Sequence, residues 1–258
     1  MKESVLRKEY MVKPSESDAQ QQLPLTLLIS QMIDLATDHA NFLDIGFLNL
    51  ESRNLGWVLL RVSVEMARWP KTGEKYTLST WVENFNSHFS ERCFSVVSQN
   101  GEILGFIRTV WVIIDLDTHK SVGTAGLQLP PELIAGLDCP IPRQVKHRHF
   151  EPEKETEYIF KYTDLDFYRH VNTVRYIALL INQYRLEDFD RNVLSRFDVA
   201  FSTEGKYGET ALIKSIEEEI ETPGMIKEKN VPSQKRTFEI SVGSRIILTA
   251  SLVLTPKD

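Results

Sequence analysis

The stretch TDLDFYRHVNTVRYIALLINQY, residues 163–184, joins a polar loop to a strongly apolar segment. Apolar residues recur three or four positions apart in its second part, which predicts a helix over residues 172–187. Leu179 and Leu180 extend the apolar character beyond a single stripe. We therefore expect this helix to be wrapped by a sheet rather than laid on a surface. The residues that share its main face are Val174, Ile177, Ala178, Ile181 and Tyr184.

One strand-like run, residues 156–163, precedes this helix, and four follow it. The first part of the chain has the same order, with a predicted helix over residues 23–43 and then four strand-like runs. Two of those runs meet at Asn100 and Gly101, a strong signal for a hairpin. The runs are 56–69, 75–85, 90–99 and 102–116 in the first part, and 195–203, 210–220, 235–243 and 245–255 in the second.

This repeated order indicates an internal duplication of architecture. A long helix enclosed by a curled antiparallel sheet is the hot-dog arrangement, so we expect an α+β fold, a tandem (double) hot-dog. Residues 123–142 hold four of the eleven prolines and predict a linker with a short helix at 130–136. The expected units are an N-terminal half with this linker, residues 1–142, and a C-terminal half that carries the polar loop, residues 143–258.

The charge balance limits the classes of function. The 258 residues include 30 basic and 36 acidic side chains, a net charge of −6, which disfavours a general binder of nucleic acid phosphates. The two cysteines, Cys93 and Cys139, need not pair, and a reducing intracellular setting is the default. No signal peptide and no run of ~20 apolar residues is apparent. The sequence therefore predicts a cytoplasmic protein without a membrane span.

The polar loop, residues 164–172, brings Asp166 and His170 to the start of the predicted helix, with Asn172 two residues further on. One reading is a helix cap only, since a carboxylate there stabilises the helix dipole by ~0.3–1 kcal/mol. A cationic histidine, however, gains nothing at that end. A neutral imidazole beside a carboxylate suits acyl transfer, and backbone N–H groups near Val171 and Asn172 could hold the developing oxyanion.

The same loop resembles the signature of the plant and bacterial acyl-acyl carrier protein thioesterases, in which Asp-Leu-Asp-x-Asn-x-His-Val-Asn-Asn precedes the second hot-dog helix. The resemblance covers most of the chain and includes an Arg-x-Pro-x-x-Gly-acid turn in the first half. The matching residues are Asp164, Leu165, Asp166, His170, Val171, Asn172 and Tyr176 in the loop and helix, and Arg68, Pro70, Gly73 and Glu74 in the turn.

The resemblance implies that Asp166, His170 and Glu204 are catalytic, with Tyr168 and Asn172 supporting them. Glu204 would lie on the strand after the helix. The implied activity is hydrolysis of fatty acyl-acyl carrier protein in fatty acid biosynthesis, releasing free fatty acid and the carrier thiol, with acyl carrier protein as partner and without a metal or cofactor.

Three positions depart from the family pattern. Tyr168 replaces the loop asparagine; it is bulkier, and its hydroxyl can donate one hydrogen bond. Thr173 replaces the second asparagine after Val171. Gly205 stands where plant members carry a cysteine once considered a nucleophile, so we expect no cysteine nucleophile.

Two alternative functions stay open. One is an acyl-CoA thioesterase of the same fold, and the other is a non-catalytic acyl-binding protein, which Tyr168 motivates. The sequence does not determine the preferred acyl chain. A monomer and a homodimer both fit, because a tandem chain already supplies the pairing that single hot-dog domains obtain by dimerising.

Other conspicuous residues have simpler interpretations. Cys93 is expected to be a small buried hydrophobe. His147 and His149 lack nearby ligands that would complete a zinc site. The basic cluster of residues 143–149 is either a solvated linker face or a docking surface for an acidic carrier protein. The four tryptophans, which are core residues or line an acyl pocket, are Trp57, Trp69, Trp81 and Trp111.

Overall fold

The computed structural model of the chain describes residues 3–145, 149–221 and 232–257. Its strands form one antiparallel sheet in the order β1-β3-β4-β5-β2-β7-β10-β9-β8-β6. The strands are β1 (Val5–Met11), β2 (Leu55–Met66), β3 (Lys75–Phe85), β4 (Ser90–Ser98), β5 (Ile103–Asp115), β6 (Lys154–Ile159), β7 (Asn192–Phe201), β8 (Thr210–Glu221), β9 (Pro232–Val242) and β10 (Arg245–Pro256). The helices are α1 (Leu25–Phe42), α2 (Phe47–Glu51), α3 (Thr173–Ile181) and α4 (Leu186–Arg191), with 3-10 turns at Pro14–Glu16, Pro131–Leu133 and Tyr162–Asp164.

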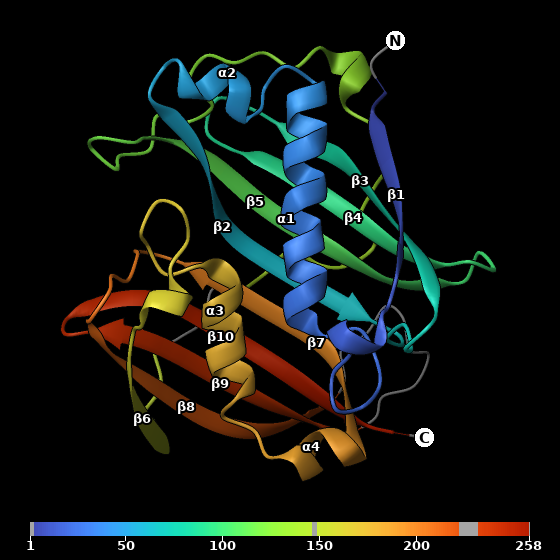
Figure 1. The fold of residues 1–258 in the computed structure, drawn as a ribbon, viewed down its shortest axis with the longest axis vertical. Coiled ribbons are helices and arrows are strands. Elements are labelled where there is room, and N and C mark those ends of the chain that lie inside the picture. The colour runs from blue at the N-terminus through green and yellow to red at the C-terminus, as the bar shows by residue number, and fades with distance from the viewer. Residues whose placement is uncertain (1–2, 146–148, 222–231, 258) are drawn as a thin grey trace.

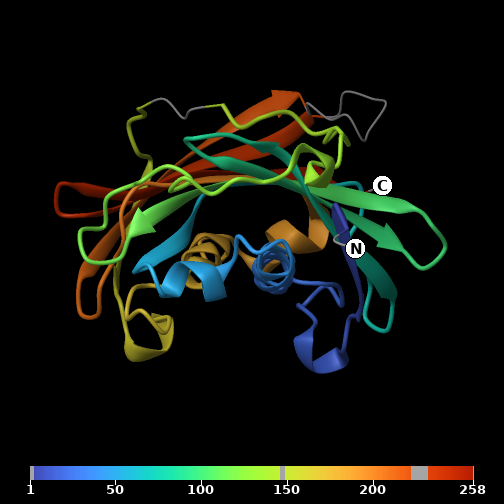
Figure 2. The same cartoon turned by 90° about the horizontal axis from the view of Figure 1, so that it is seen from above.

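The sheet curves around the helices, and α1 and α3 lie side by side in its hollow (Figures 1 and 2). Helix α1 buries the apolar residues that recur along it, and α3 buries side chains on more than one side. Burial of apolar surface against the sheet stabilises both helices by roughly 25 cal/mol for each Å² removed from water. The expectation that a sheet encloses the two predicted helices is therefore confirmed.

The two parts of the chain meet in the middle of the sheet, where β2 pairs with β7. Arg61 lies opposite Ala200 in this ladder, and Glu65 lies opposite Arg196. The guanidinium of Arg196 also donates to the Glu65 carboxylate at 2.8 Å. Because this junction is a continuous ladder, the end of β7 lies beside β2 of the first part of the chain.

The sequence did not predict a strand before the first helix, whereas the structure has β1 there. β1 pairs with β3 from Val5 opposite Trp81 to Met11 opposite Lys75. It forms one edge of the sheet, so its side chains are only partly buried and its sequence lacks apolar alternation. With β1 included, each half has the same order of one strand, one main helix and four strands.

The predicted second helix is too long, because α3 ends at Ile181 and a separate short helix, α4, begins at Leu186. Arg236 on β9 donates to the carbonyl of Gln183 at 2.9 Å. Its guanidinium also lies 4.2 Å from the ring centre of Tyr184. These contacts hold the segment after α3 against the sheet and take the place of a further helical turn.

The linker crosses the face of the sheet opposite the helices (Figure 2). Cys139 and Ile141 pack there with Trp81 and Cys93, and the Trp81 indole donates to the carbonyl of Leu137 at 2.8 Å. Cys93 is buried, as predicted. The helices of the described ranges include none long and apolar enough to cross a membrane.

Candidate active site

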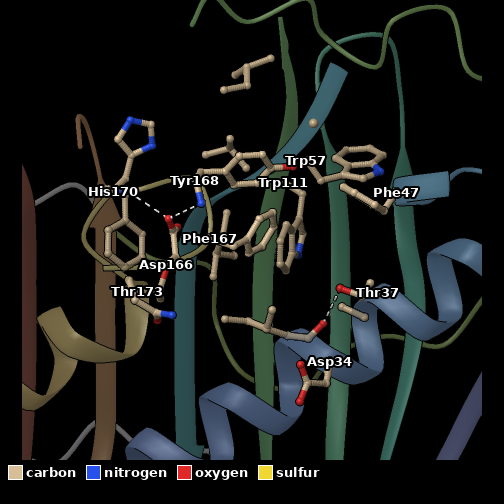
Figure 3. Close-up of a pocket in the computed structure, with 18 of the residues that line it drawn as sticks. Asp34, Thr37, Phe47, Trp57, Trp111, Asp166, Phe167, Tyr168, His170 and Thr173 are labelled. Carbon is tan, nitrogen blue, oxygen red and sulfur yellow. Dashed lines mark hydrogen bonds between the residues drawn. The ribbon is translucent and has the colours of Figure 1, made fainter. Parts of the chain in front are cut away.

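Asp166 organises the loop that leads into α3. One of its carboxylate oxygens, Oδ1, accepts the backbone N–H groups of Tyr168 at 2.9 Å and His170 at 3.1 Å (Figure 3). The Asp166 amide in turn donates to the His170 carbonyl at 2.8 Å. The other oxygen, Oδ2, has no hydrogen-bond partner in the described part of the chain. Asp166 therefore both shapes the loop and keeps one oxygen available to a ligand.

His170 and Glu204 form the central contact of the site. Nδ1 of His170 lies 3.1 Å from Oε2 of Glu204, and the two side chains are 20% and 39% exposed. Glu204 follows β7, so this contact joins the loop before α3 to the end of a strand. This partly buried position leaves the pair accessible to a substrate and shields it in part from water.

Backbone contacts fix the segment that carries Glu204. The Val171 amide donates to the Gly205 carbonyl at 3.0 Å, and the Gly205 amide donates to the Tyr176 hydroxyl at 2.8 Å. A Cβ at position 205 would lie 2.6 Å from Phe160 Cε2 and 2.8 Å from Tyr176 Oη. Gly205 thus fills a position where a side chain does not fit without movement, which gives a physical reason for its departure from the family pattern.

His119 is a member of the site that the sequence did not reveal. It lies in the turn after β5, and its Nδ1 is 3.6 Å from Glu204 Oε2. Its ring also meets the His170 ring edge to face, with centroids 5.6 Å apart. No local signal marks His119, because it approaches the other residues only through the β2–β7 junction. The described residues contain no group of three or more side chains arranged to hold a metal ion.

The prediction that the Val171 and Asn172 amides hold the oxyanion is wrong, because both amides already donate to carbonyl groups of the protein. The Val171 amide is bonded to Gly205, and the Asn172 amide donates to the Asp164 carbonyl at 2.8 Å. Asn172 is the N-cap of α3, and its side chain accepts from the Val174 amide at 2.9 Å. Thr173 is the first residue of α3, and its amide meets no acceptor among the residues that the structure describes. This amide lies at the positive end of the helix dipole and is the available donor there.

Tyr168 lies at the rim of the site, with its side chain near Phe167 in Figure 3. The two ring centres are 4.1 Å apart, and Tyr168 is 41% exposed. Burial, and then the charges of Glu51 and Asp166, raises the pKa of Tyr168 above its ordinary value. The hydroxyl makes no hydrogen bond with a described residue.

A cavity of about 1080 Å³ connects these residues with the space beside α1. All five residues expected at the site line it, and its far wall includes aromatic side chains of the first half (Figure 3). Trp57 and Trp111 are among them, whereas Trp69 and Trp81 are buried elsewhere. The expected site residues that line the cavity are Asp166, Tyr168, His170, Asn172 and Glu204.

Two family models match the chain: the acyl-ACP thioesterase N-terminal domain over residues 3–133 and the acyl-ACP thioesterase C-terminal domain over residues 147–243. A chloroplastic palmitoyl-acyl carrier protein thioesterase of Gossypium hirsutum is 25% identical over 220 residues, which are 78% of this chain and 52% of the relative. The chain thus spans about half the length of the curated relatives that it matches first.

Solved structures are similar over nearly the whole chain. An acyl-ACP thioesterase from Bacteroides thetaiotaomicron has a TM-score of 0.82 and 25% identity, and the match covers 97% of this chain and 98% of that one. The 12:0-ACP thioesterase from Umbellularia californica has a TM-score of 0.77 and 19% identity, covering 98% and 94% of the two chains. The latter similarity concerns the fold alone.

Proposed function

Because this chain belongs to the acyl-ACP thioesterase family, we propose that it hydrolyses the thioester of fatty acyl-acyl carrier protein. Water adds to the acyl carbonyl, the C–S bond breaks, and the products are a free fatty acid and the phosphopantetheine thiol. The observation that carries this proposal is the pair of His170 and Glu204, 3.1 Å apart, on the wall of a cavity of about 1080 Å³. The cavity offers room for an acyl chain next to groups that can move a proton.

His170 acts as the base in this proposal. The Glu204 carboxylate accepts a hydrogen bond from the Nδ1–H group of His170. This bond holds the imidazole in the tautomer whose Nε2 is free to accept a proton from water. Glu204 also stabilises the imidazolium that then forms. The imidazolium returns the proton to the departing sulfur, so the side chains end the cycle as they began. Asp166 orients the reacting water or carbonyl through its unbonded Oδ2.

The developing oxyanion is placed at the N-terminus of α3. The Thr173 amide is the donor there, and the dipole of α3 adds its positive end. Loss of one such donor in other enzymes typically lowers kcat by ~10²–10³. We expect the Thr173 amide to contribute a factor of the same order to kcat. Asn172 supports the arrangement by capping the helix, which fixes the direction of the Thr173 N–H.

The finer features of the fold belong to the same proposal. We interpret the sheet as a tandem hot-dog with halves at residues 1–142 and 143–258, supported by the equal element order on either side of the β2–β7 junction.

Acyl carrier protein is the proposed partner, with monomer and homodimer both open. The basic cluster at 143–149 lies partly outside the described residues. A cytoplasmic location stays a prediction from the sequence.

A thiol-release assay tests the function. Purified protein is mixed with matched acyl-acyl carrier protein and acyl-CoA thioesters of several chain lengths, and free thiol is measured. We expect release from acyl carrier protein thioesters, with a larger kcat/KM than for the CoA thioesters. A larger kcat/KM for CoA thioesters would favour the acyl-CoA thioesterase. Stoichiometric acyl binding without thiol release would favour the non-catalytic binder.

A further inference from the structure

Among the residues that the structure describes, the buried arginines have carboxylate partners, with one exception. Arg108 is paired with Glu83, and Arg236 is paired with Glu217. Such pairing is expected, because a buried cation without a counter-charge is strongly destabilising. Arg92 on β4 differs. It is 4% exposed, and no carboxylate of the described ranges forms an ion pair with it.

The hydrogen bonds of Arg92 use only one of its three guanidinium nitrogens. Nη1 donates to His39 Nδ1 at 2.7 Å and to Thr80 Oγ1 at 3.3 Å. Within the described ranges, Nε and Nη2 donate to no protein atom. The fully enclosed side-chain atoms that lack a partner belong to Tyr10, Glu65, Gln144 and Tyr184 and not to Arg92. The two unused nitrogens of Arg92 therefore still reach open space.

The neighbouring histidine does not neutralise this charge. Burial, and then the charge of Arg92, lowers the pKa of His39 to about 4, so His39 is a neutral acceptor at neutral pH. Burial lowers the pKa of Arg92 to about 10, which leaves the guanidinium protonated at neutral pH. The interior thus contains a cation with unused donors.

Arg92 lines the same cavity as the catalytic residues. Phe201 ends β7, the strand that Glu204 follows. On the neighbouring strands, Leu59 of β2 lies opposite Trp111 of β5, and Trp111 lies opposite Ser90 of β4. These residues all line the cavity and form a row across the sheet.

Arg92 is two positions beyond Ser90 and faces the same side. Three spacings of ~4.8 Å between neighbouring strands separate β4 from β7 by roughly 14 Å. At about 1.5 Å a bond, that distance corresponds to on the order of ten bonds of an extended chain.

The orientation of a substrate follows from the two ends of the cavity. Phe167 and Tyr168 are exposed at the catalytic end, whereas Arg92 and its hydrogen-bond partner His39 on α1 are both buried. A phosphopantetheine arm is attached to a protein and enters from the open end. The acyl chain then runs inward past Trp57 and Trp111, and its far end approaches Arg92.

We propose that Arg92 binds an oxygen atom near the distal end of the acyl chain. The preferred substrates are then thioesters whose chains carry a hydroxyl, oxo or carboxylate group at that end, rather than plain hydrocarbon chains. This inference rests on the proposed function for the position of the thioester. A hydrocarbon end would leave the Arg92 cation buried without a partner, whereas an oxygen accepts from Nε or Nη2.

The test compares matched acyl-acyl carrier protein thioesters with chains of eight to fourteen carbons, each with a methyl, hydroxyl or carboxylate end. We expect kcat/KM to be about 10- to 100-fold higher for an oxygen-bearing chain of fitting length than for the methyl chain. The hydroxyl and carboxylate arms show whether a neutral or an anionic acceptor is preferred. Equal or higher kcat/KM for methyl-ended chains at every length overturns the inference.

Substitutions of Arg92 test whether its guanidinium causes the preference for oxygen-bearing chains. Arg92→Met retains the apolar stem and should reverse the preference toward methyl-ended chains. Arg92→Lys keeps the charge with different geometry and should give an intermediate ratio. Arg61→Met removes an exposed arginine of β2 outside the cavity and should keep the wild-type ratio. If Arg92→Met does not fold, the comparison of the wild type with Arg92→Lys decides. An unchanged ratio of kcat/KM for oxygen-bearing over methyl-ended chains in folded Arg92 variants contradicts the inference.

Binding separates this inference from the proposed function. Calorimetry with free fatty acids, ω-hydroxy fatty acids and dicarboxylic acids measures the same preference without any hydrolysis. Tighter binding of oxygen-ended ligands that depends on Arg92, without thiol release from any thioester, would retain the inference and reject the function. Thiol release with no Arg92-dependent preference in either measurement would retain the function and reject the inference.

Discussion

Nδ1 of His170 lies 3.1 Å from Oε2 of Glu204, so a loop before α3 and a segment after β7 contribute to one proton-transferring pair. The contact is held by backbone bonds on both sides, since Val171 donates to the Gly205 carbonyl. Backbone hydrogen bonds of the second half therefore fix the two segments that carry His170 and Glu204.

Substitutions at His170 and Asp166 test the proposed chemistry. His170→Ala and Asp166→Asn should each lower kcat by at least ~100-fold, the usual effect of losing a positioned acid or base. Asp166→Asn retains an oxygen that accepts the Tyr168 and His170 amides, so the loop should persist. Asp166→Ala removes that acceptor and should also lower the free energy of unfolding by about 1 kcal/mol. Near-normal kcat in folded Asp166→Asn would mean that the carboxylate only shapes the loop.

His119 is expected to position Glu204 rather than to react. The two side chains are 51% and 39% exposed, and exposed ion pairs contribute up to about 1 kcal/mol, which is roughly fivefold in rate. His119→Gln should therefore lower kcat no more than roughly fivefold. In a Glu204→Gln background the same change should have no further effect, because its target is gone. Additive losses in this double-mutant cycle would assign His119 a role of its own.

Gly205 should not tolerate the side chain that plant members carry. Gly205→Cys places a Cβ 2.6 Å from Phe160 and 2.8 Å from the Tyr176 hydroxyl, and overpacking of this kind typically costs about 1–3 kcal/mol. Gly56→Ala is the matched control, because its Cβ would meet only the flexible Leu116 side chain, at 3.0 Å. Urea denaturation measures both variants. Equal stability of Gly205→Cys and wild type would show that Phe160 and Tyr176 move freely.

His39 should make the fold sensitive to acid. Burial and Arg92 lower its pKa from 6.5 to about 4 in the folded protein. Because the unfolded chain takes up the proton more readily, the stabilisation is complete above pH 6.5 and is lost as the pH falls toward 4. The loss amounts to about 3 kcal/mol. Urea denaturation of wild type and His39→Gln at pH 7 and pH 4.5 measures this difference. Parallel losses in both proteins would exclude His39 as the cause.

The repeated order of elements and the position of the polar loop were predictable from the sequence. Apolar periodicity, the Asn100-Gly101 turn and the residues around Asn172 act over a few neighbouring positions, so their consequences are local. The same locality explains two errors. β1 has little apolar alternation because it is an edge strand, and the apolar pattern continues past Ile181 although contacts with Arg236 end the helix there.

Only the tertiary structure decided which distant residues meet. The pairing of β2 with β7 brings the His119 turn of the first half to Glu204 of the second. The fold also buries Arg92 on the wall of the cavity that His170 lines, and no carboxylate of the described residues forms an ion pair with it. Such contacts depend on strand order and register across the whole sheet. No local pattern encodes them, because each residue alone would be compatible with a solvent-exposed turn or an ordinary strand.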